Sequence, residues 1–408
     1  MKKPKITISF GRIGPYQHAR VNSLLPHFEV TYLESNGDDK SHHWKNAGAG
    51  ARYQKITLFK DDSYLQTVPP AVIKKKVFDT LDIFKPDLLA ITGWYEKVAL
   101  SMLLWGIEHN VPRIMMTESN EMDFQRKGIK EFVKRRILKC CHSGVAGGKL
   151  SKQYFEKLDF KYNPLGIYYD VVDNSHFQKG SALARKFAAR FRKSLGLPEN
   201  YFFTSCRFIQ KKNLKTLLLS YADYAQKVKK PWSLVLAGDG PLKSEMVALI
   251  KELGLNDLVK MPGYIQYNQL PIYYGLAKVF ILPSTTEQWG LVVNEAMAAG
   301  LPVLVSKKCG CAPDLAKNGV NGFQFDPYDR KKLSDLMIRI SVQKAKLNVM
   351  GKQSQRIVSE WSPENFGKSI KKAGDYAFKT NHLDFNYLDK ILIKLLIYCP
   401  NFIYRSSE

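Results

Sequence analysis

The chain has 408 residues, of which 45% are hydrophobic and 24% are charged. This length exceeds what one typical hydrophobic core accommodates, so the sequence predicts two domains. No uncharged apolar run reaches the roughly eighteen residues that cross a bilayer, and the apolar run near the amino terminus is too short for a signal peptide. We therefore expect a cytoplasmic protein. The six cysteines form no CxxC pair and no zinc-like set with histidine, so we expect reduced thiols and no metal site.

The first part of the chain alternates short β-rich runs with helix-compatible segments. The predicted strands are 5–10, 28–33, 55–59, 87–92, 113–118 and 144–148, and the predicted helices include 16–27, 71–84 and 95–110. Buried strands that are linked by helices form parallel βαβ units, so this pattern indicates a doubly wound α/β sheet.

The pattern then starts again. The predicted strands are 201–206, 232–238, 279–284 and 302–306, and the predicted helices are 213–228, 241–254, 267–277 and 291–299. We interpret the polar and basic segment 174–200, which contains Gly196 and Pro198, as a linker. The expected domains are 1–175 and 176–362, followed by a helix over 363–380 that returns to the first domain and by an apolar and basic tail over 381–408.

The tail contains an apolar segment at 387–405 that is too short and too charged to span a membrane. Two interpretations stay open: the segment packs on one of the domains, or it lies in a lipid interface.

The formal net charge of +25 is larger than solubility requires. Nucleic acid, an anionic membrane surface and phosphorylated substrates are the partners that such a charge could serve. Many of the cations lie in 126–152, where 124–140 has the pattern of a basic amphipathic helix. This helix could place its apolar side in the core and its basic side in water, or it could dock on an anionic membrane. We find no recognisable nucleic-acid-binding motif, so nucleic acid is not an expected partner.

The segment TTEQWGLVVNEAMAAGLPVL, residues 285–304, contains two acidic residues eight positions apart. Glu287 falls in a loop after a predicted strand, and Glu295 falls about one turn into the next helix. A helical spacing would place the carboxylates roughly 12 Å apart, which does not suit a glycosidase acid and nucleophile acting on one bond. Two contacts to different parts of a long polar ligand fit better. The backbone amides of Gly290, Leu291 and Val292 begin the helix, where a phosphate is best held.

Two further βα turns could contribute to the same edge of the second sheet. Arg207 and Lys212 follow one predicted strand, and Gly238 and Gly240 follow the next. Fixed cations offset the charge of a diphosphate, and a glycine turn allows a close backbone approach.

The run R207-x4-K212, then LAGDGP, then E287-x7-E295 followed by AMAAGLPVL, resembles the retaining glycosyltransferases of family 4, which have the GT-B fold. The likeness covers about residues 201–326. It implies two doubly wound Rossmann-like domains that face each other across a cleft, and transfer of a sugar from a nucleotide donor with retained configuration. Arg207 and Lys212 would hold the diphosphate, Glu287 would lie near the sugar, and Glu295 would bind the ribose. In the first domain the resemblance implies Gly14 and, at a position where family members often have histidine, Glu118.

The resemblance implies no cofactor beyond a nucleotide-sugar co-substrate, with UDP- or GDP-sugars expected. No D-x-D motif occurs in the sequence, which agrees with a metal-independent enzyme. The expected acceptor is a lipid-linked sugar or a growing surface glycan, and we expect peripheral contact with an anionic membrane on its inner face. Three alternatives remain: a sugar-nucleotide epimerase of the same fold, a basic nucleic-acid-binding protein, and a non-catalytic sugar-binding relative.

Overall fold

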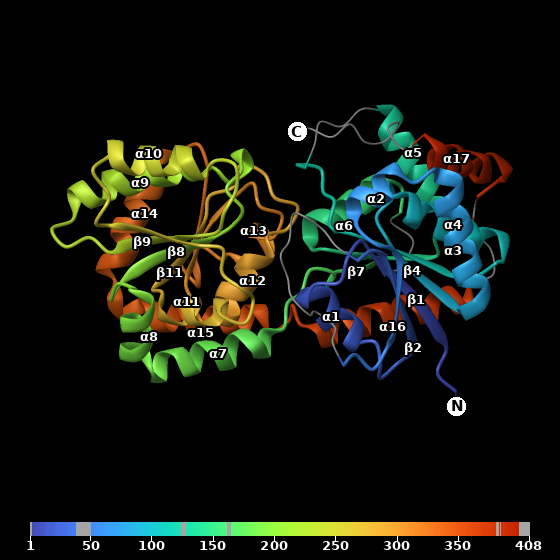
Figure 1. Ribbon diagram of the computed structural model, residues 1–408, viewed down its shortest axis with the longest axis horizontal. Coiled ribbons are helices and arrows are strands. Elements are labelled where there is room, and N and C mark those ends of the chain that lie inside the picture. Colours follow the sequence, from blue (N-terminus) through green and yellow to red (C-terminus); the bar gives the residue numbers. More distant parts are fainter. Residues whose placement is uncertain are drawn as a thin grey trace. The chain divides into compact units, whose positions relative to one another are not determined.

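A computed structural model describes residues 2–37, 50–123, 128–160, 165–380, 383 and 385–399. The chain forms two compact units (Figure 1). Unit 1 comprises Met1–Val171 and Pro363–Glu408, and unit 2 comprises Val172–Ser362. Compared with the boundaries expected at 175/176 and 362/363, the units divide at 171/172 and 362/363.

Unit 1 contains a seven-stranded sheet in the order β3-β2-β1-β4-β5-β6-β7, with every pairing parallel. The chain order reverses between β1 and β4, and parallel sheets bind ligands beyond the carboxyl ends of their strands at such a switch point. The strands are β1 (Lys5–Phe10), β2 (Glu29–Asn36), β3 (Gln54–Phe59), β4 (Leu88–Thr92), β5 (Arg113–Thr117), β6 (Ser143–Ala146) and β7 (Leu165–Gly166).

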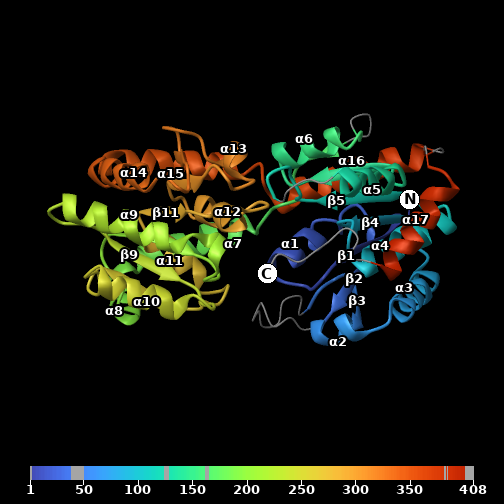
Figure 2. The ribbon, with the colours of Figure 1, turned by 90° about the horizontal axis from the view of Figure 1, so that it is seen from above.

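Helices cover both faces of this sheet. They are α1 (Pro15–Asn22), α2 (Asp62–Thr67), α3 (Pro70–Phe84), α4 (Lys97–Glu108), α5 (Gly128–Lys139), α6 (Lys149–Lys157), α16 (Pro363–Lys379) and α17 (Tyr387–Tyr398). One core lies between the sheet and α3, α4, α5, α6 and α17. On the other face α16 packs on β5, β6 and β7 and contacts α1. Helices α3 and α4 lie side by side in both views (Figures 1 and 2).

Unit 2 contains a six-stranded parallel sheet in the order β10-β9-β8-β11-β12-β13. The strands are β8 (Tyr201–Ser205), β9 (Ser233–Ala237), β10 (Val259–Gly263), β11 (Val279–Leu282), β12 (Val303–Ser306) and β13 (Gly322–Phe325). The helices are α7 (Asn174–Lys186), α8 (Ala188–Leu195), α9 (Leu214–Lys227), α10 (Lys243–Glu252), α11 (Leu270–Leu276), α12 (Leu291–Ala298), α13 (Ala312–Leu315), α14 (Arg330–Val342) and α15 (Lys344–Val358). The two doubly wound parallel sheets confirm the predicted α/β class.

The interpretation of 174–200 as a linker was wrong. This segment forms α7 and α8, and α7 packs on α11 and α12 within unit 2. The Ser181 hydroxyl donates to the Pro271 carbonyl, and at Gly275 a Cβ would lie only 2.8 Å from the Ser181 backbone. Small residues therefore let two helices approach closely, a pattern that polar and basic composition does not reveal.

Helix α17 packs on unit 1. For the described residues of the tail, the structure therefore agrees with the interpretation that the segment packs on one of the domains. Ile393, Leu396 and Ile397 are buried in the core beside α3, α4 and α5. Residues 400–408 and 124–127, which belonged to the predicted tail and basic helix, lie outside the described residues. Among the helices that the structure describes, none combines the length and the apolar character needed to cross a membrane.

The packing of α17 can be tested with two leucines on opposite sides of this helix. Leu396 is 2% exposed and Leu395 is 59% exposed. We expect Leu396→Ala to lower the free energy of unfolding of unit 1 by about 2–5 kcal/mol, because it leaves a cavity in the core. Leu395→Ala should change it by less than about 0.5 kcal/mol. Equal effects of both substitutions in urea denaturation would show that α17 does not pack in this register.

Candidate active site

An ion pair joins two of the predicted site residues at the carboxyl edge of the unit 2 sheet. Lys212 Nζ lies 2.6 Å from Glu287 Oε2, and Lys211 Nζ lies 4.0 Å from Glu287 Oε1. The Lys212 and Glu287 side chains are only 14% and 13% exposed. Each carboxylate oxygen thus faces one cation, in surroundings that strengthen electrostatic interactions.

Backbone contacts fix both partners of this pair. After β8, residues Gln210–Lys212 form one 3-10 turn that ends at Asn213, whose φ is +55°. The Asn213 side-chain amide, through Nδ2, donates to the main-chain carbonyls of Pro283, at 3.2 Å, and Pro327, at 2.8 Å. The Glu287 amide donates to the Lys308 carbonyl, and the Gly310 amide donates to the Glu287 carbonyl. Asn213 and the loop that contains Lys308 were missed in the sequence, although asparagine before an apolar helix is a usable signal for a left-handed residue.

The surroundings of the pair keep Lys212 charged. Burial is the largest single effect and lowers the pKa of Lys212, but the Glu287 carboxylate, together with Cys206 and Cys309, outweighs burial, and the pKa is raised. Burial raises the pKa of the neighbouring Cys206 thiol to about 12, even though Lys212 favours its thiolate. Cys206 is therefore a neutral thiol near pH 7 and a poor nucleophile.

Gly238 and Gly240 are required by the packing of two loops. Their φ angles are +134° and +154°. A Cβ at Gly238 would overlap the carbonyl oxygen of Cys206, and one at Gly240 would lie 2.6 Å from the carbonyl oxygen of Phe208. The Phe208 amide donates to the Asp239 carbonyl at 2.8 Å. The glycines therefore hold their loop against the loop that carries Arg207, whose side chain is exposed.

Helix α12 begins beside the ion pair. Gly290, with a φ of +106°, is its N-cap residue, and Leu291 and Val292 form its first turn. A Cβ at Gly290 would lie 3.5 Å from Glu287 Cγ, so the helix start and the Glu287 side chain are neighbours. Glu295 lies one turn further on, is fully buried, and accepts a 2.7 Å hydrogen bond from the Tyr274 hydroxyl.

The two predicted site residues of unit 1 lie in loops that follow β1 and β5. Gly14 is the N-cap of α1 and has a φ of −122°, an extended conformation that any residue adopts. Its loop is fixed by the buried Glu34, which accepts a 2.8 Å hydrogen bond from the Ile13 amide. Glu118 directly follows β5. The structure thus brings Arg207, Lys212, Glu287, Gly290 and Glu295 to one edge of unit 2, whereas Gly14 and Glu118 belong to unit 1.

Glu118 belongs to a buried charged cluster that sequence reasoning missed. Arg20 Nη2 lies 3.2 Å from Asp170 Oδ1, and both side chains are almost fully buried. The Arg20 guanidinium also lies 4.6 Å from the centre of the Tyr169 ring. Burial raises the pKa of Asp170 to about 6, against the opposing effects of Arg20 and of a hydrogen bond with Glu118.

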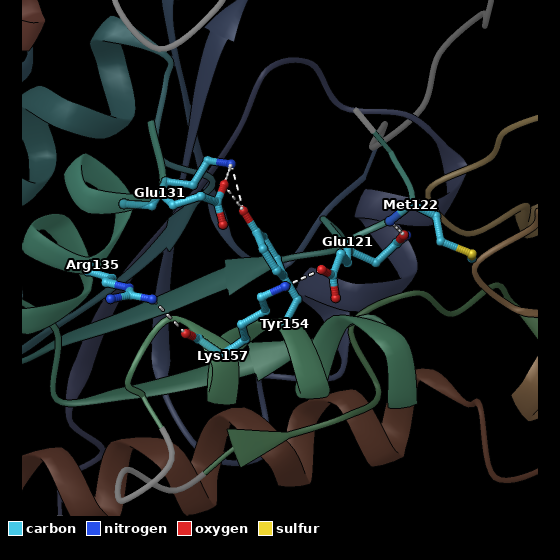
Figure 3. A network of polar contacts seen from close by, with 8 residues as sticks. Glu121, Met122, Glu131, Arg135, Tyr154 and Lys157 are labelled. Carbon is cyan, nitrogen blue, oxygen red and sulfur yellow. Dashed lines mark hydrogen bonds and ion pairs between the residues drawn. The ribbon is translucent and has the colours of Figure 1, made fainter. Parts of the chain in front are cut away.

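The basic segment uses part of its charge inside unit 1. Lys134 is buried and donates to the Tyr154 hydroxyl at 2.7 Å, and Tyr154 in turn donates to Glu131 at 2.7 Å. Figure 3 shows Tyr154 directed at Glu131, and Arg135 directed at the main chain of Lys157. The expectation that the whole basic face of this helix meets water or a membrane is therefore wrong for Lys134.

Comparison with known proteins defines a class. Residues 186–357, most of unit 2, match the family model described as Glycosyl transferases group 1. The fold resembles that of Anabaena Alr3699/HepE in complex with UDP, with a TM-score of 0.70 and 16% identity over 91% of this chain and 99% of that chain. These comparisons show that the fold is of the GT-B type and that most of unit 2 matches the group 1 family model.

Two curated relatives extend this comparison. The chain is 31% identical to the sulfoquinovosyl transferase SQD2 of Arabidopsis thaliana over 81% of its own length and 65% of that protein. It is 26% identical to a GDP-mannose-dependent alpha-(1-6)-phosphatidylinositol monomannoside mannosyltransferase of Mycobacterium tuberculosis, over 47% of this chain and 50% of that protein. The chain therefore spans between half and two thirds of the length of these two relatives.

The Asp170 cluster predicts a specific pH dependence of stability. Since the pKa of Asp170 is raised from 3.8 to about 6 in the folded chain, its stabilising contribution is present below about pH 4 and is lost as the pH rises through 6. Asp170→Asn cannot titrate but can still accept from Arg20. We expect the free energy of unfolding of the wild type, relative to this variant, to fall between pH 4 and pH 6.5 in urea denaturation.

Asp79→Asn, at an exposed position on α3, is the matched control. The free energy of unfolding of the wild type relative to Asp79→Asn should show no such fall. A constant difference between wild type and Asp170→Asn over this range would contradict the raised pKa.

Proposed function

We propose that the protein is a retaining glycosyltransferase of family 4, which moves a sugar from a nucleotide donor to an acceptor. The observation that carries this proposal is the Lys212–Glu287 ion pair at the start of α12. It joins a cation suited to phosphate with a carboxylate suited to sugar hydroxyls. The E-x7-E spacing and the match of 186–357 to Glycosyl transferases group 1 support it.

In the proposed reaction the bond between the anomeric carbon and the donor phosphate breaks. Arg207 and Lys212 stabilise the negative charge that develops on the departing diphosphate, and the amides of Gly290, Leu291 and Val292 add to this stabilisation. The acceptor oxygen attacks from the same face, and its proton passes to the departing phosphate. No protein carboxylate becomes covalently attached, so the contribution of the protein is positioning and electrostatics.

The two glutamates have different proposed roles. Glu287, which faces Lys211 and Lys212, orients the sugar while keeping Lys212 protonated. Glu295 binds the ribose, and its bond from Tyr274 sets the orientation of the carboxylate. A buried carboxylate with a fixed orientation discriminates strongly between ligands that can and cannot hydrogen-bond to it. Gly14 and Glu118 stay predictions that come from the family resemblance.

We further propose a UDP- or GDP-sugar as donor, no metal ion, and a lipid-linked sugar or growing surface glycan as acceptor. UDP is bound in the HepE structure, and a relative is named for GDP-mannose and phosphatidylinositol monomannoside. The net charge of +25 suits a protein that works at the anionic inner surface of a membrane.

A thermal-shift screen against UDP-, GDP-, ADP-, CDP- and dTDP-sugars tests the donor site. A donor at about a hundred times its Kd should add about 2.7 kcal/mol to the free energy of unfolding, and the shift should persist in EDTA. Lys212→Ala should abolish this shift, because it removes the central phosphate contact. Lys215→Ala removes an equal charge from an exposed position of α9 and should keep the shift. A shift that needs Mg²⁺, or none with any donor, would contradict the proposal.

Glutamine variants separate the two carboxylates while keeping their size. Glu287→Gln should lower kcat by about a hundredfold with a smaller change in donor Kd, since it acts on the reacting sugar. Glu295→Gln should weaken donor binding by about tenfold or more, with Tyr274 still able to donate to the amide oxygen. Calorimetric titration and initial rates measure both quantities. Equal and negligible effects would reject these assignments.

A further inference from the structure

Helix α17 has two apolar sides, of which only one is covered. Ile393, Leu396 and Ile397 face the core of unit 1. The opposite side carries four large apolar residues that are each at least half exposed: Tyr387 at 75%, Leu388 at 66%, Leu395 at 59% and Tyr398 at 50%. A helix with a second, uncovered apolar side is suited to a second apolar environment.

Helix α5 also presents large apolar side chains to its outside. Ile129 is 61% exposed and Phe132 is 58% exposed, whereas Val133, Ile137 and Leu138 are buried. Ile129 and Phe132 begin an outer stripe of α5, which continues at helical spacing with the exposed cations Arg135 and Lys139. Lys134, by contrast, is buried and contacts Glu131 and Tyr154. The outer side of α5 thus has apolar residues in its first half and cations in its second.

One arginine joins these two helices. Arg136, one turn after Phe132, forms an ion pair with Asp389 and donates to the Asn386 side chain at 3.1 Å. Tyr387 and Leu388 lie between these two contacts in the sequence, so the first turn of α17 lies next to the outer stripe of α5. Both views show α17 beside α5 and α4 (Figures 1 and 2).

We propose that the α5–α17 surface, formed by Ile129, Phe132, Tyr387, Leu388, Leu395 and Tyr398, contacts an anionic lipid bilayer. This inference rests on the membrane contact in the proposed function and names the part of unit 1 that makes it. The aliphatic and phenyl side chains enter the interfacial layer, and the two tyrosines suit the boundary between acyl chains and headgroups. Helix α17 is then a packed helix and an interfacial helix at once.

Charge favours a bilayer over the other occupants of an apolar surface. Lys130, Arg135 and Lys139 on α5, and Lys390 and Lys394 on α17, lie beside the apolar residues on the same two helices. Arg135 also faces Asp159, and Lys390 and Lys394 also face Glu108. Anionic headgroups attract such cations. A second copy of the chain would bring another net charge of +25 to the interface, which opposes self-association. Nucleic acid would satisfy the cations but would leave the leucines exposed.

Unit 2 has a second surface of similar composition, which supplies a control. Leu183 on α7, Phe187 between α7 and α8, and Leu195 at the end of α8 are 53%, 44% and 37% exposed. No acidic residue occurs between 174 and 195. This surface is as basic as the α5–α17 surface but exposes fewer large apolar side chains. It therefore distinguishes a membrane contact of this particular surface from attraction of any basic patch.

The test is cosedimentation of the full chain with vesicles of phosphatidylcholine alone or with about a third phosphatidylglycerol. We expect binding to the anionic vesicles only. Leu388→Ser with Leu395→Ser should weaken that binding by about tenfold or more, because two leucines lose their transfer into the interface. Ile129→Ser with Phe132→Ser should have a similar effect. Leu183→Ser with Phe187→Ser should bind like the wild type.

Retained binding by the α17 double variant would overturn the inference, as would an equal loss in the unit 2 control. A monomer produced from a wild-type dimer by the α17 variant, seen in sedimentation velocity, would also overturn it in favour of a subunit interface. Donor thermal shifts are measured on every variant. Since they report on unit 2, a failed donor site and a failed membrane surface give different results.

Discussion

The Lys212–Glu287 ion pair is the interaction on which the site in unit 2 depends. Both side chains are mostly buried, so removing either partner leaves a charge that water cannot fully solvate, at a cost of about 3–5 kcal/mol. Such a pair is a poor source of net stability, because desolvation offsets most of the attraction. Its value is therefore in geometry: it keeps a protonated amine and a carboxylate 2.6 Å apart at the start of a helix.

The surrounding backbone explains how this geometry is maintained. Asn213 ties the turn of Lys212 to Pro283, which follows β11, and Gly310 ties Glu287 to the loop after β12. Gly238 and Gly240 allow the loop after β9 to pack on Cys206 and Phe208. Four neighbouring strands of one sheet, β9, β8, β11 and β12, thus end in loops that hold each other. A preorganised edge of this kind can bind a diphosphate with little rearrangement, which is what electrostatic catalysis requires.

Much of this could be predicted from the sequence, because buried parallel strands give apolar runs that alternate with helices. The strand predicted at 5–10 has the observed bounds, and the helix predicted over 363–380 is observed at Pro363–Lys379. What could not be predicted depends on contacts distant in sequence: Arg20 meets Asp170 across 150 residues, and α7 packs on α11 through small residues that a composition argument interprets as a linker. The sequence pattern assigns the two glycines of LAGDGP to close backbone approach of a ligand. The structure shows that their positive φ angles also serve the packing of this loop on the neighbouring loop.

The charge of the chain shows why composition alone could not name a partner. Within one basic helix, Lys134 is buried beside Glu131, Arg136 pairs with Asp389, and Arg135 lies 3.4 Å from Asp159. These cations connect α5 to α6 and α17, so they stabilise unit 1 before they can attract any partner. The outer side of α5 exposes Lys139 together with Ile129 and Phe132. A surface that combines exposed cations with exposed apolar side chains has the chemistry of a membrane interface, whereas the total of +25 is equally compatible with nucleic acid.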